Sequence, residues 1–348
     1  MPEEPNRTAV LEGPRRLRLV ERPKPDPVPG EAVVRIAATA VCHTDLSMYT
    51  GSHPGLRYPV VMGHEATGVV ESVGEGVKGL APGRHVIINP IIACGTCEEC
   101  ARGAENLCRN AGLFGREVEG SLAEFVRLPA RYLHTLPENM PLASATLIET
   151  LATVRHAQQR AGIAAGESVV VLGQGATGLL HTRLAVLSGA NPVIGVSRSA
   201  WKLERSSRMG AHEVIDATAE VAVVEALRLT GGKGADVVID TVGDKGSLRA
   251  GVDMLKPGGR FLAYAVSHEP VAGFASFPLY YKELTIVGSR ALIAQDMAPS
   301  IELVASGRVP VSDFISASFS LEDAPAAFEE YERNPGGILR VVIESGMH

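Results

Sequence analysis

The chain has 348 residues, of which 45% are hydrophobic and 21% are charged, and its formal net charge is −6. This composition is typical of a globular protein and excludes a disordered one. The length indicates about two domains, and the acidic balance gives no electrostatic footprint for a nucleic-acid partner.

The N-terminus reads Met-Pro-Glu-Glu-Pro-Asn-Arg and lacks the basic start and apolar run of a signal peptide. No apolar segment has the length needed to span a bilayer. We therefore expect a soluble cytoplasmic protein with no membrane partner. Its five cysteines would then be reduced, and they suit metal binding or catalysis better than disulfides.

Up to about residue 135 the sequence predicts a β-rich domain with irregular loops. Residues 14–30 are punctuated by prolines, among them Pro23, Pro25, Pro27 and Pro29, and form an extended entry that cannot be a helix. β-type runs follow, separated by turns that contain glycine or proline, at 31–41, 67–73, 85–89 and 121–128. The first of these runs places Cys42 at a strand end or in the loop after it.

From residue 142 helices and strands alternate. The predicted helices cover 142–160, 177–188, 200–209, 219–229 and 247–255, and the predicted strands cover 168–172, 192–196, 213–215, 236–241, 260–265 and 284–288. This alternation is typical of βαβ units in a doubly wound parallel sheet. After about 291 the pattern is mixed again, with strands near 314–319 and 338–343. We predict an α/β domain inserted between two pieces of the β-rich domain.

The segment from Cys42 to Glu65 indicates a metal site. Cys42 and His64 offer sulfur and nitrogen ligands, a pair that suits Zn²⁺ better than hard cations. Glu65 adjoins His64, and Glu149 lies in an apolar setting where a carboxylate needs a partner. The alternative is a buried thiol and an ordinary histidine, and these residues alone do not decide between the two.

A second metal site is indicated by four cysteines with the spacing C-x₂-C-x₂-C-x₇-C, namely Cys94, Cys97, Cys100 and Cys108. Four thiolates can close a tetrahedron around one structural Zn²⁺. The alternatives are free thiols or an iron–sulfur cluster. The bacterial ferredoxin pattern has three residues and then Cys-Pro at its last step, and this sequence has neither.

A glycine-rich turn follows the predicted strand 168–172 directly and reads Gly173-Gln-Gly175-Ala-Thr-Gly178. In this context Gly173 permits a tight turn, Gly175 lets the backbone approach a pyrophosphate, and Gly178 lets the helix pack against the strand. The pattern therefore predicts a dinucleotide cofactor rather than an ordinary turn.

Together these motifs resemble the zinc-dependent alcohol dehydrogenases of the medium-chain dehydrogenase/reductase superfamily. The matching stretches are Cys42-His-Thr-Asp45, Gly63-His-Glu-x-x-Gly68, the four-cysteine segment and Gly173–Gly178. The resemblance implies a Rossmann-type domain at 151–290, inserted in a β-rich, GroES-like catalytic domain formed by 1–150 and 291–348. It also implies a homodimer or homotetramer with two zinc ions per chain.

The resemblance further assigns roles at the first metal site. Cys42 and His64 would bind the catalytic zinc, and Glu149 stands where polyol and threonine dehydrogenases have an acidic ligand. Glu65 would exchange with water or substrate on the metal, and Asp45 would accept a hydrogen bond from His64.

A proton relay is implied as well. Thr44 would begin it at the substrate alcohol. Some members place a histidine three residues later, where this chain has Ser47. His53 could replace it, although a simple loop residue is the more ordinary interpretation of His53.

The cofactor contacts implied by the resemblance are Gly173, Gly175, Ala176, Thr177, Gly178, Ser197, Arg198, Lys202, His43, Thr153 and Arg340. Among them, His43 would lie near the phosphates, Thr153 beside the nicotinamide, and Arg340 near the pyrophosphate.

The residues after the second strand of the α/β domain favour NADP over NAD. NAD-binding units place an acidic residue there for the ribose hydroxyl, whereas this chain has Ser197-Arg198 and no Asp or Glu between Gly178 and Glu204. A serine and an arginine can both bond a 2′-phosphate. The pair also resembles the turn of NADP-dependent bacterial secondary alcohol dehydrogenases. The alternative is that Arg198 stacks on the adenine or points to solvent.

We therefore expect a zinc-dependent enzyme that transfers hydride reversibly between a primary or secondary alcohol and NAD(P), giving an aldehyde or ketone. A polyol or amino-alcohol substrate is the main alternative. A zinc-free quinone or enoyl reductase would lack the Cys42 and His64 pair, and a non-catalytic scaffold that binds zinc and nucleotide is a remote alternative. An apolar substrate pocket is suggested by Tyr49, Leu113, Phe114 and Tyr281.

Overall fold

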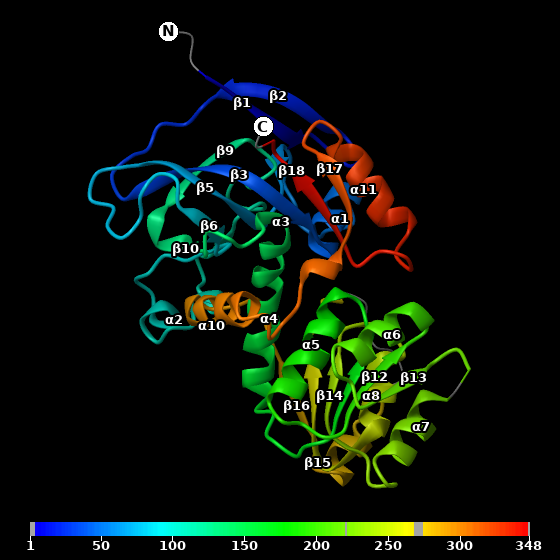
Figure 1. The fold of residues 1–348 in the computed structure, drawn as a ribbon. Coiled ribbons are helices and arrows are strands. Elements are labelled where there is room, and N and C mark those ends of the chain that lie inside the picture. The colour runs from blue at the N-terminus through cyan, green and yellow to red at the C-terminus, as the bar shows by residue number, and fades with distance from the viewer. Residues whose placement is uncertain (1–3, 220, 268–273, 347–348) are drawn as a thin grey trace. The chain divides into compact units, whose positions relative to one another are not determined.

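The computed structural model describes residues 4–219, 221–267 and 274–346 (Figure 1). The chain divides into two compact units, one formed by Met1–Ala152 with Leu292–His348 and the other by Thr153–Ala291. Across the described residues, no helix combines the length and the apolar character that a membrane span requires.

The first unit is rich in β-structure. Its strands are β1 (Pro5–Leu11), β2 (Leu17–Pro23), β3 (Glu31–Val41), β4 (Val60–Val61), β5 (Glu65–Val73), β6 (His85–Ile88), β7 (Ile91–Ile92), β8 (Gly112–Leu113), β9 (Phe125–Pro129), β10 (Leu133–Thr135), β17 (Ile315–Ser320) and β18 (Arg340–Glu344). Its helices are α1 (His43–Thr50), α2 (Glu98–Ala101), α3 (Leu142–Ala145), α10 (Ala294–Ala305) and α11 (Ala324–Arg333), with 3₁₀ turns η1 (Glu105–Leu107), η2 (Ala130–Tyr132) and η3 (Ser312–Phe314). Helix α4 (Leu147–Ala161) begins in this unit and continues into the other.

Strand β3 organises the first unit. It is the longest strand and lies in the main sheet, whose order is β10-β6-β5-β3-β18-β17 with β9 also paired to β3. Every second side chain near its start, at Ala32, Val34 and Ile36, enters one hydrophobic cluster. The chain returns from the second unit to place β18 beside the end of β3, with Val341 opposite Val41. Strands β3 and β18, which come from the two chain segments of this unit, therefore lie side by side in the main sheet (Figure 1).

The second unit alternates strands and helices: β11 (Val169–Leu172), α5 (Ala176–Leu187), β12 (Val193–Ser197), α6 (Ala200–Arg208), β13 (Glu213–Asp216), α7 (Ala222–Leu229), β14 (Ala235–Asp240), α8 (Ser247–Met254), β15 (Leu255–Ala263), α9 (Phe277–Tyr281) and β16 (Thr285–Gly288). All pairings in its sheet are parallel, and the order is β13-β12-β11-β14-β15-β16. This order reverses direction at β11 and β14, as in a doubly wound dinucleotide-binding sheet. The predicted fold class is confirmed.

The sheet of the second unit is buried on both faces. Val169 and Val171 of β11 lie in a cluster with Ala157 of α4 and Ala185 of α5. The alternate residues of the same strand lie in a second cluster with side chains of α7 and α8. Because successive strand residues point to opposite faces, a run such as Val-Val-Val-Leu fits only a strand covered on both sides.

Several elements differ from the prediction. The predicted helix 142–160 is divided at Thr146, whose hydroxyl donates to the carbonyl of Ala143 (2.7 Å) and lies between α3 and α4. Strands β1 and β2 were not predicted, because prolines dominate the neighbouring sequence. Pro23 lies at the last position of β2, a strand that pairs only with β1 in the described sheet.

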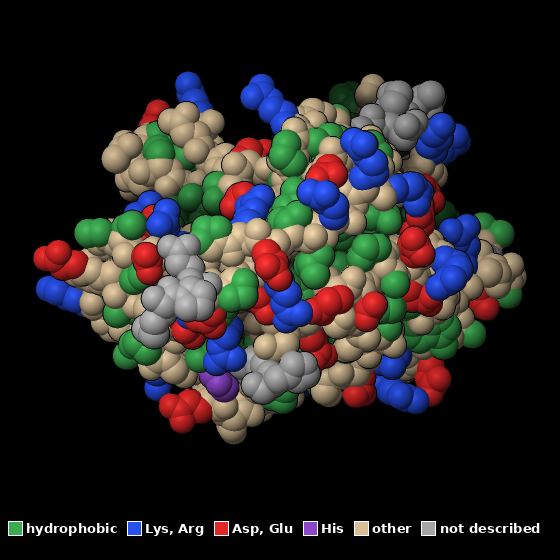
Figure 2. All heavy atoms as spheres, turned by 90° about the horizontal axis from the view of Figure 1, so that it is seen from above, with side chains coloured by type: hydrophobic (Ala, Val, Ile, Leu, Met, Phe, Trp, Pro, Cys, Tyr) green, Lys and Arg blue, Asp and Glu red, His purple; other side chains and the backbone are tan. Residues whose placement is uncertain are grey.

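The surface carries charges of both signs. In Figure 2, Lys and Arg side chains are intermingled with Asp and Glu side chains over the visible face. Some of these charges form exposed pairs, such as Arg15 with Glu332 at 2.7 Å. Pairs of this kind contribute little to stability, because solvent screens them.

Candidate active site

The end of β3 brings Cys42 against His64. Cys42 caps the N-terminus of α1, and its Sγ lies 3.2 Å from Nε2 of His64. Asp45 fixes both segments: its Oδ2 accepts the backbone N–H of Cys42 (3.2 Å), and its Oδ1 accepts the backbone N–H of Gly63 (3.3 Å). The same Oδ1 lies 3.3 Å from Nδ1 of His64. Asp45 thus holds the imidazole with Nε2 towards the thiol.

Gly63 is required at this position. Its φ is +94°, and a Cβ atom there would lie 2.6 Å from Oγ of Ser121 and 2.8 Å from a methyl carbon of Thr39. A side chain would be both strained and sterically excluded. The backbone at Gly63 therefore packs closely against Ser121 and Thr39, and this packing places His64 next to Cys42.

Glu65 opens β5 and is paired with a buried arginine. Its Oε1 lies 3.2 Å from Nη2 of Arg340, which also donates to Oγ1 of Thr150 (2.7 Å). The Oε2 atom of Glu65 is buried and has no hydrogen-bond partner among the described residues. An ionised carboxylate oxygen in this state is costly unless a cation joins it. Arg340 is 3% exposed, and we keep its predicted pyrophosphate contact as a proposal.

Glu149 is buried in the first turn of α4 and adds a second carboxylate. Burial, together with the negative charge of Glu65, raises the pKa of Glu149 to about 8. Burial likewise raises the pKa of Glu65, against the opposing charge of Arg340. For His64, burial acts to lower the pKa, but Asp45 and Cys42 raise it well above its usual range. The raised pKa values show that burial favours the neutral form of both carboxyl groups, and a bound cation would favour their ionised forms.

These residues fit a zinc ion. The ligand atoms of Cys42, His64 and Glu65 lie within 4.8 Å of one another, and all three residues are enclosed. A sulfur, an imidazole nitrogen and a carboxylate oxygen are the donors that Zn²⁺ takes in catalytic sites. Glu149 lies outside this set of three, although its charge interacts with Glu65 and His64. Its role as a ligand remains a proposal.

The relay residues lie on α1 and just after it. Thr44 is half-buried in the first turn of the helix. The hydroxyl of Ser47 donates to the backbone carbonyl of Thr44 (2.8 Å), and the backbone N–H of His53 donates to the carbonyl of Ser47 (3.0 Å). Nδ1 of His43 lies 3.3 Å from the hydroxyl of Tyr331. The predicted relay and phosphate roles of these residues stay proposals.

The four cysteines of the second metal site come together on a segment with little core of its own. Helix α2 buries no side chain. The Sγ atoms of Cys94 and Cys100 are 3.9 Å apart, those of Cys97 and Cys100 3.5 Å, and those of Cys94 and Cys108 3.5 Å. A tetrahedron with Zn–S bonds of about 2.3 Å has edges of about 3.8 Å. The four thiols fit one zinc ion and are too far apart for disulfides.

The thiol pKa values in this cluster diverge. Hydrogen bonds from the backbone and hydroxyl of Thr96 lower the pKa of Cys94 to about 6. The backbone N–H of Cys100 favours the thiolate of Cys97, yet burial and the neighbouring thiols raise its pKa to about 12. Four thiols at this distance therefore do not ionise together without a cation, and a divalent metal supplies that charge.

The glycine-rich turn forms a cradle between β11 and α5. Gly173 has a φ of +86°, and a Cβ atom on Gly178 would lie 2.0 Å from the carbonyl oxygen of Gly173. Around Gly175, in contrast, no atom of the described residues other than its chain neighbours lies within 4 Å of the Cβ position. This open space at a helix N-terminus, followed by Ala176 and Thr177, fits the pyrophosphate of a dinucleotide.

Gln174 was missed by the sequence analysis. Its side chain is 1% exposed, and it points into the unit. Nε2 donates to the carbonyl of Val171 (3.1 Å), and Oε1 accepts the hydroxyl of Thr182 (3.0 Å). Gln174 therefore ties the turn to β11 and α5. A hydrophilic residue between two glycines was the only available signal.

Three cofactor candidates cluster after β12. The hydroxyl of Ser197 accepts the backbone N–H of Ser199 (3.2 Å), Arg198 is exposed, and Lys202 lies one turn into α6. Burial lowers the pKa of Lys202. On the neighbouring strand Asp216 is opposite Ser197, but its Oδ1 accepts both the N–H and the hydroxyl of Thr218. Arg198 and Lys202 bring basic side chains to this segment, while hydrogen bonds from Thr218 lower the pKa of Asp216 and favour its negative charge on the neighbouring strand.

The suggested apolar substrate pocket is not supported. Tyr49 is stacked on Phe328 in the core of the first unit, with ring centroids 4.7 Å apart. Phe114 is buried in the other large cluster of that unit. Tyr281 lies on the second unit and is 73% exposed. Aromatic residues near a motif more often fill a core than line a pocket.

Comparison with known protein families gives two matches. The family described as "Alcohol dehydrogenase GroES-like domain" matches residues 28–138, and the family "Zinc-binding dehydrogenase" matches residues 176–306. The first match lies in the β-rich unit with both metal sites, and the second begins inside the glycine-rich turn, at Ala176, and covers most of the parallel sheet.

Individual relatives agree with these matches. A D-xylulose reductase A of Aspergillus oryzae is 33% identical over 340 residues, which cover 95% of each chain. The solved alcohol dehydrogenase TADH of Thermus sp. ATN1 is 32% identical, with a TM-score of 0.89 over 97% of this chain and 99% of its own. A zinc-binding dehydrogenase of Sinorhizobium meliloti bound to NADP is 30% identical, with a TM-score of 0.90 over 99% and 100%.

Proposed function

The chain belongs to the zinc-binding alcohol dehydrogenase family of the medium-chain dehydrogenase/reductase superfamily, and we propose that it interconverts a primary or secondary alcohol with its aldehyde or ketone. It is a zinc-dependent NAD(P) dehydrogenase. The observation that carries the proposal is the enclosed set of Cys42, His64 and Glu65, whose ligand atoms lie within 4.8 Å. An open metal site of this kind, in a chain that also has a dinucleotide-binding fold, suits hydride transfer better than a scaffold role.

Two bound groups supply chemistry that the side chains lack: Zn²⁺ would polarise the substrate oxygen as a Lewis acid, and the nicotinamide would accept or return the hydride. Cys42 and His64 would hold the metal, with Glu65 and Glu149 as the candidates for the remaining protein ligand. The dinucleotide would be held by the cradle at Gly175.

The protein side chains orient the metal ligands and accept the proton of the substrate. Asp45 keeps the lone pair of His64 Nε2 available for a metal. Arg340 pairs with Oε1 of Glu65, which leaves Oε2 of Glu65 available to bind the metal. We assign Thr44 to accept the proton from the substrate hydroxyl. Ser47 donates to the Thr44 carbonyl, so a route to solvent through Ser47 requires that this bond opens.

A polyol and its ketose form a second candidate substrate pair. Two observations favour it: the acidic Glu149, as in the polyol dehydrogenases, and the D-xylulose reductase relative, which by its name reduces a ketose. A panel of simple primary alcohols, simple secondary alcohols and C4–C6 polyols, assayed with both cofactors, tests the choice. A kcat/KM highest for a polyol would select this candidate. No turnover of any alcohol by the zinc-loaded protein would contradict the proposed function.

We propose NADP as the preferred cofactor. Ser197, Arg198 and Lys202 gather after β12, where a 2′-phosphate would lie, and Asp216 is bonded to Thr218. A related structure binds NADP. Each charge-assisted hydrogen bond to phosphate contributes about 1.5–3 kcal/mol, which corresponds to roughly a tenfold to hundredfold preference.

Replacing Arg198 with alanine should lower kcat/KM for NADP about tenfold to hundredfold and leave kcat/KM for NAD nearly unchanged, because only NADP carries the 2′-phosphate. The measurement is steady-state kinetics with each cofactor. Arg208→Ala is the matched control, since this exposed arginine is on α6 and pairs with Glu204. A native preference for NAD, or equal losses with both cofactors, would refute the assignment.

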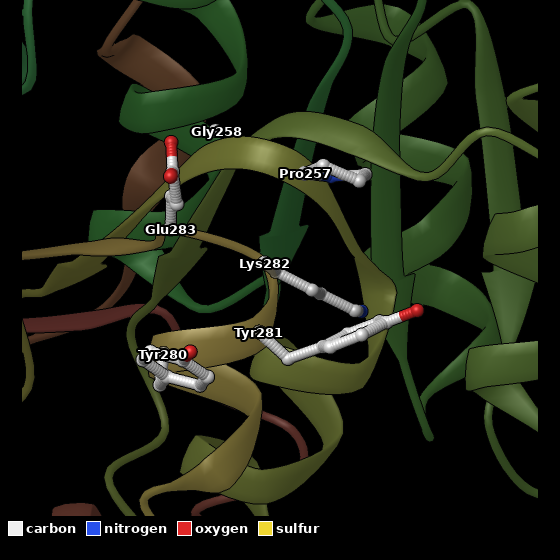
Figure 3. A pocket seen from close by; sticks show the side chains of 6 residues that line it. All are labelled: Pro257, Gly258, Tyr280, Tyr281, Lys282 and Glu283. Atoms are coloured by element: carbon white, nitrogen blue, oxygen red, sulfur yellow. The ribbon is translucent and has the colours of Figure 1, made fainter.

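We also propose a homodimer or homotetramer whose copies meet along β16. This strand lies at the edge of the six-stranded sheet, and Ile286 on it is 45% exposed. Phe277 and Tyr281, the first and last residues of α9, are stacked and exposed. Figure 3 shows the residues that line the adjacent hollow, namely Pro257, Gly258, Tyr280, Tyr281, Lys282 and Glu283. An unpaired edge with aromatic neighbours is suited to pairing with a second copy.

Ile286→Glu should therefore reduce the mass of the particle in sedimentation velocity, since two copies would bring like charges together across a twofold axis. Val224→Glu, an exposed valine on α7, provides the control. If the native protein is a monomer, or if Ile286→Glu keeps the native mass, the assembly does not use this edge.

The thiolate chemistry of both metal sites suits a reducing compartment such as the cytoplasm.

A further inference from the structure

Tyr264 follows the carboxyl end of β15 directly, at the edge of the sheet where dinucleotides bind. Its backbone N–H donates to the carbonyl of Asp240, the last residue of β14 (3.2 Å). Its hydroxyl lies 2.7 Å from Oγ1 of Thr153, across 111 residues of sequence. This short contact joins the end of the sheet to α4.

The ring of Tyr264 has a rigid support. His181 of α5 meets it edge to face, with centroids 4.6 Å apart and an interplanar angle of 85°. His181 is fully buried, and burial lowers its pKa to about 3, so the imidazole is neutral. Gln158 Nε2 donates to the backbone carbonyl of His181 (2.7 Å) and lies 3.2 Å from its Nδ1. Nδ1 is then the acceptor and Nε2 carries the proton.

The ring and the hydroxyl of Tyr264 therefore have separable roles. The ring packs against the hydrophobic cluster around β11 and against His181, and a phenylalanine would retain these contacts. The hydroxyl adds the bond to Thr153. A threonine in a helix divides between two χ1 rotamers, and a partner on Oγ1 favours the one that keeps the bond. That choice decides where the methyl and hydroxyl groups of Thr153 lie.

We propose that Tyr264 is a positioning residue for the nicotinamide ring and that it acts by holding Thr153 in one rotamer. The inference rests on the proposed function, in which Thr153 lies beside the nicotinamide. Hydride transfer is sensitive to small displacements of the reacting carbon, because reacting atoms must approach to about 3–3.5 Å. If Thr153 has one fixed rotamer, the nicotinamide ring beside it can occupy a smaller range of positions.

Tyr264→Phe tests the inference through binding as well as turnover. With the metal-loaded protein, fluorescence titration of the preferred reduced cofactor should give a Kd raised about 3- to 10-fold. The Kd of the matching ADP-ribose, which lacks the nicotinamide, should stay at the native value. In kinetics kcat should fall more than the KM for alcohol rises. The melting temperature should not change.

A double-mutant cycle that combines Tyr264→Phe with Thr153→Val shows whether Tyr264 affects cofactor binding through Thr153 or independently of it. If Tyr264 acts through Thr153, the double variant binds the reduced cofactor no more weakly than Thr153→Val alone, and Thr153→Ser, which keeps the hydroxyl, retains sensitivity to Tyr264→Phe. Tyr58→Phe controls for hydroxyl removal, since that hydroxyl bonds to the Met48 carbonyl in the other unit. Additive losses, or equal weakening of both ligands, would overturn the inference. A native protein that binds neither ligand would instead contradict the cofactor assignment, and the inference with it.

Discussion

Replacing Cys42 or His64 with alanine should remove one of two zinc equivalents and lower turnover by more than about a thousandfold, while the fold persists. The two residues are in contact at 3.2 Å and are tied to the backbone by Asp45. Loss of either leaves too few ligands for a stable site. The measurements are metal analysis by mass spectrometry, kcat with the best alcohol of the panel, and circular dichroism for the fold.

Glu65→Gln and Glu149→Gln extend this experiment to the third ligand. A glutamine keeps the shape of the side chain but binds zinc poorly, so the variant that loses the metal identifies the ligand. Glu65 is favoured by geometry, since it lies in the set within 4.8 Å, whereas Glu149 is favoured by the resemblance to polyol dehydrogenases. Retention of two zinc equivalents in both Cys42→Ala and His64→Ala would show that the ligand assignment is wrong.

The type of each metal site could be predicted from the sequence because ligand chemistry is local. Cys42 and His64 are 22 residues apart, yet a thiol and an imidazole within turn-rich segments already indicate zinc. Their contact depends on one long-range feature, the antiparallel pairing of β3 and β5, with Ala40 opposite Glu65. A β-rich pattern predicts sheets but not which strands are neighbours.

What could not be predicted are the partners of these groups. Arg340 pairs with Glu65 because β18 returns to the end of β3 after the whole second unit. Tyr264 reaches Thr153 because β15 lies two places from β11 in the sheet. Neither pairing leaves a trace in spacing or periodicity. Gln174 illustrates a second limit, since only the fold decides that this polar side chain points inward.

The glycines were informative where the backbone itself is the functional part. Gly173 and Gly178 have no room for a side chain, whereas Gly175 faces open space. Gly173 and Gly178 thus serve close packing, and the open position at Gly175 fits the expected approach of a pyrophosphate. The suggestion of a pocket from aromatic residues gains no support, because Tyr49 and Phe114 have their own packing partners.

The second large effect is expected at the four-cysteine segment. Cys97→Ser should lower the melting temperature by roughly 10 °C or cause aggregation, since losing a structural metal is among the changes that cost about 4 kcal/mol or more, and each kcal/mol shifts a domain of this size by about 2–4 °C. Helix α2 buries no side chain, so the segment depends on its metal for order. Calorimetry and zinc content give the result.

Variants of the four-cysteine site should mainly lower stability, and variants of the Cys42 site should mainly lower turnover. Cys97→Ser should retain one zinc equivalent and measurable turnover at low temperature, because Cys42 and His64 lie at the ends of β3 and β5 and not on the α2 segment. Cys42→Ala should have the opposite effect: its melting temperature should stay close to the native value, while its turnover is lost. An iron–sulfur absorbance band in the native protein, or an unchanged melting temperature with two zinc equivalents in Cys97→Ser, would refute the structural assignment. If each variant instead lost both metals, the two sites would be coupled through folding, and the segment would support the active site as well as itself.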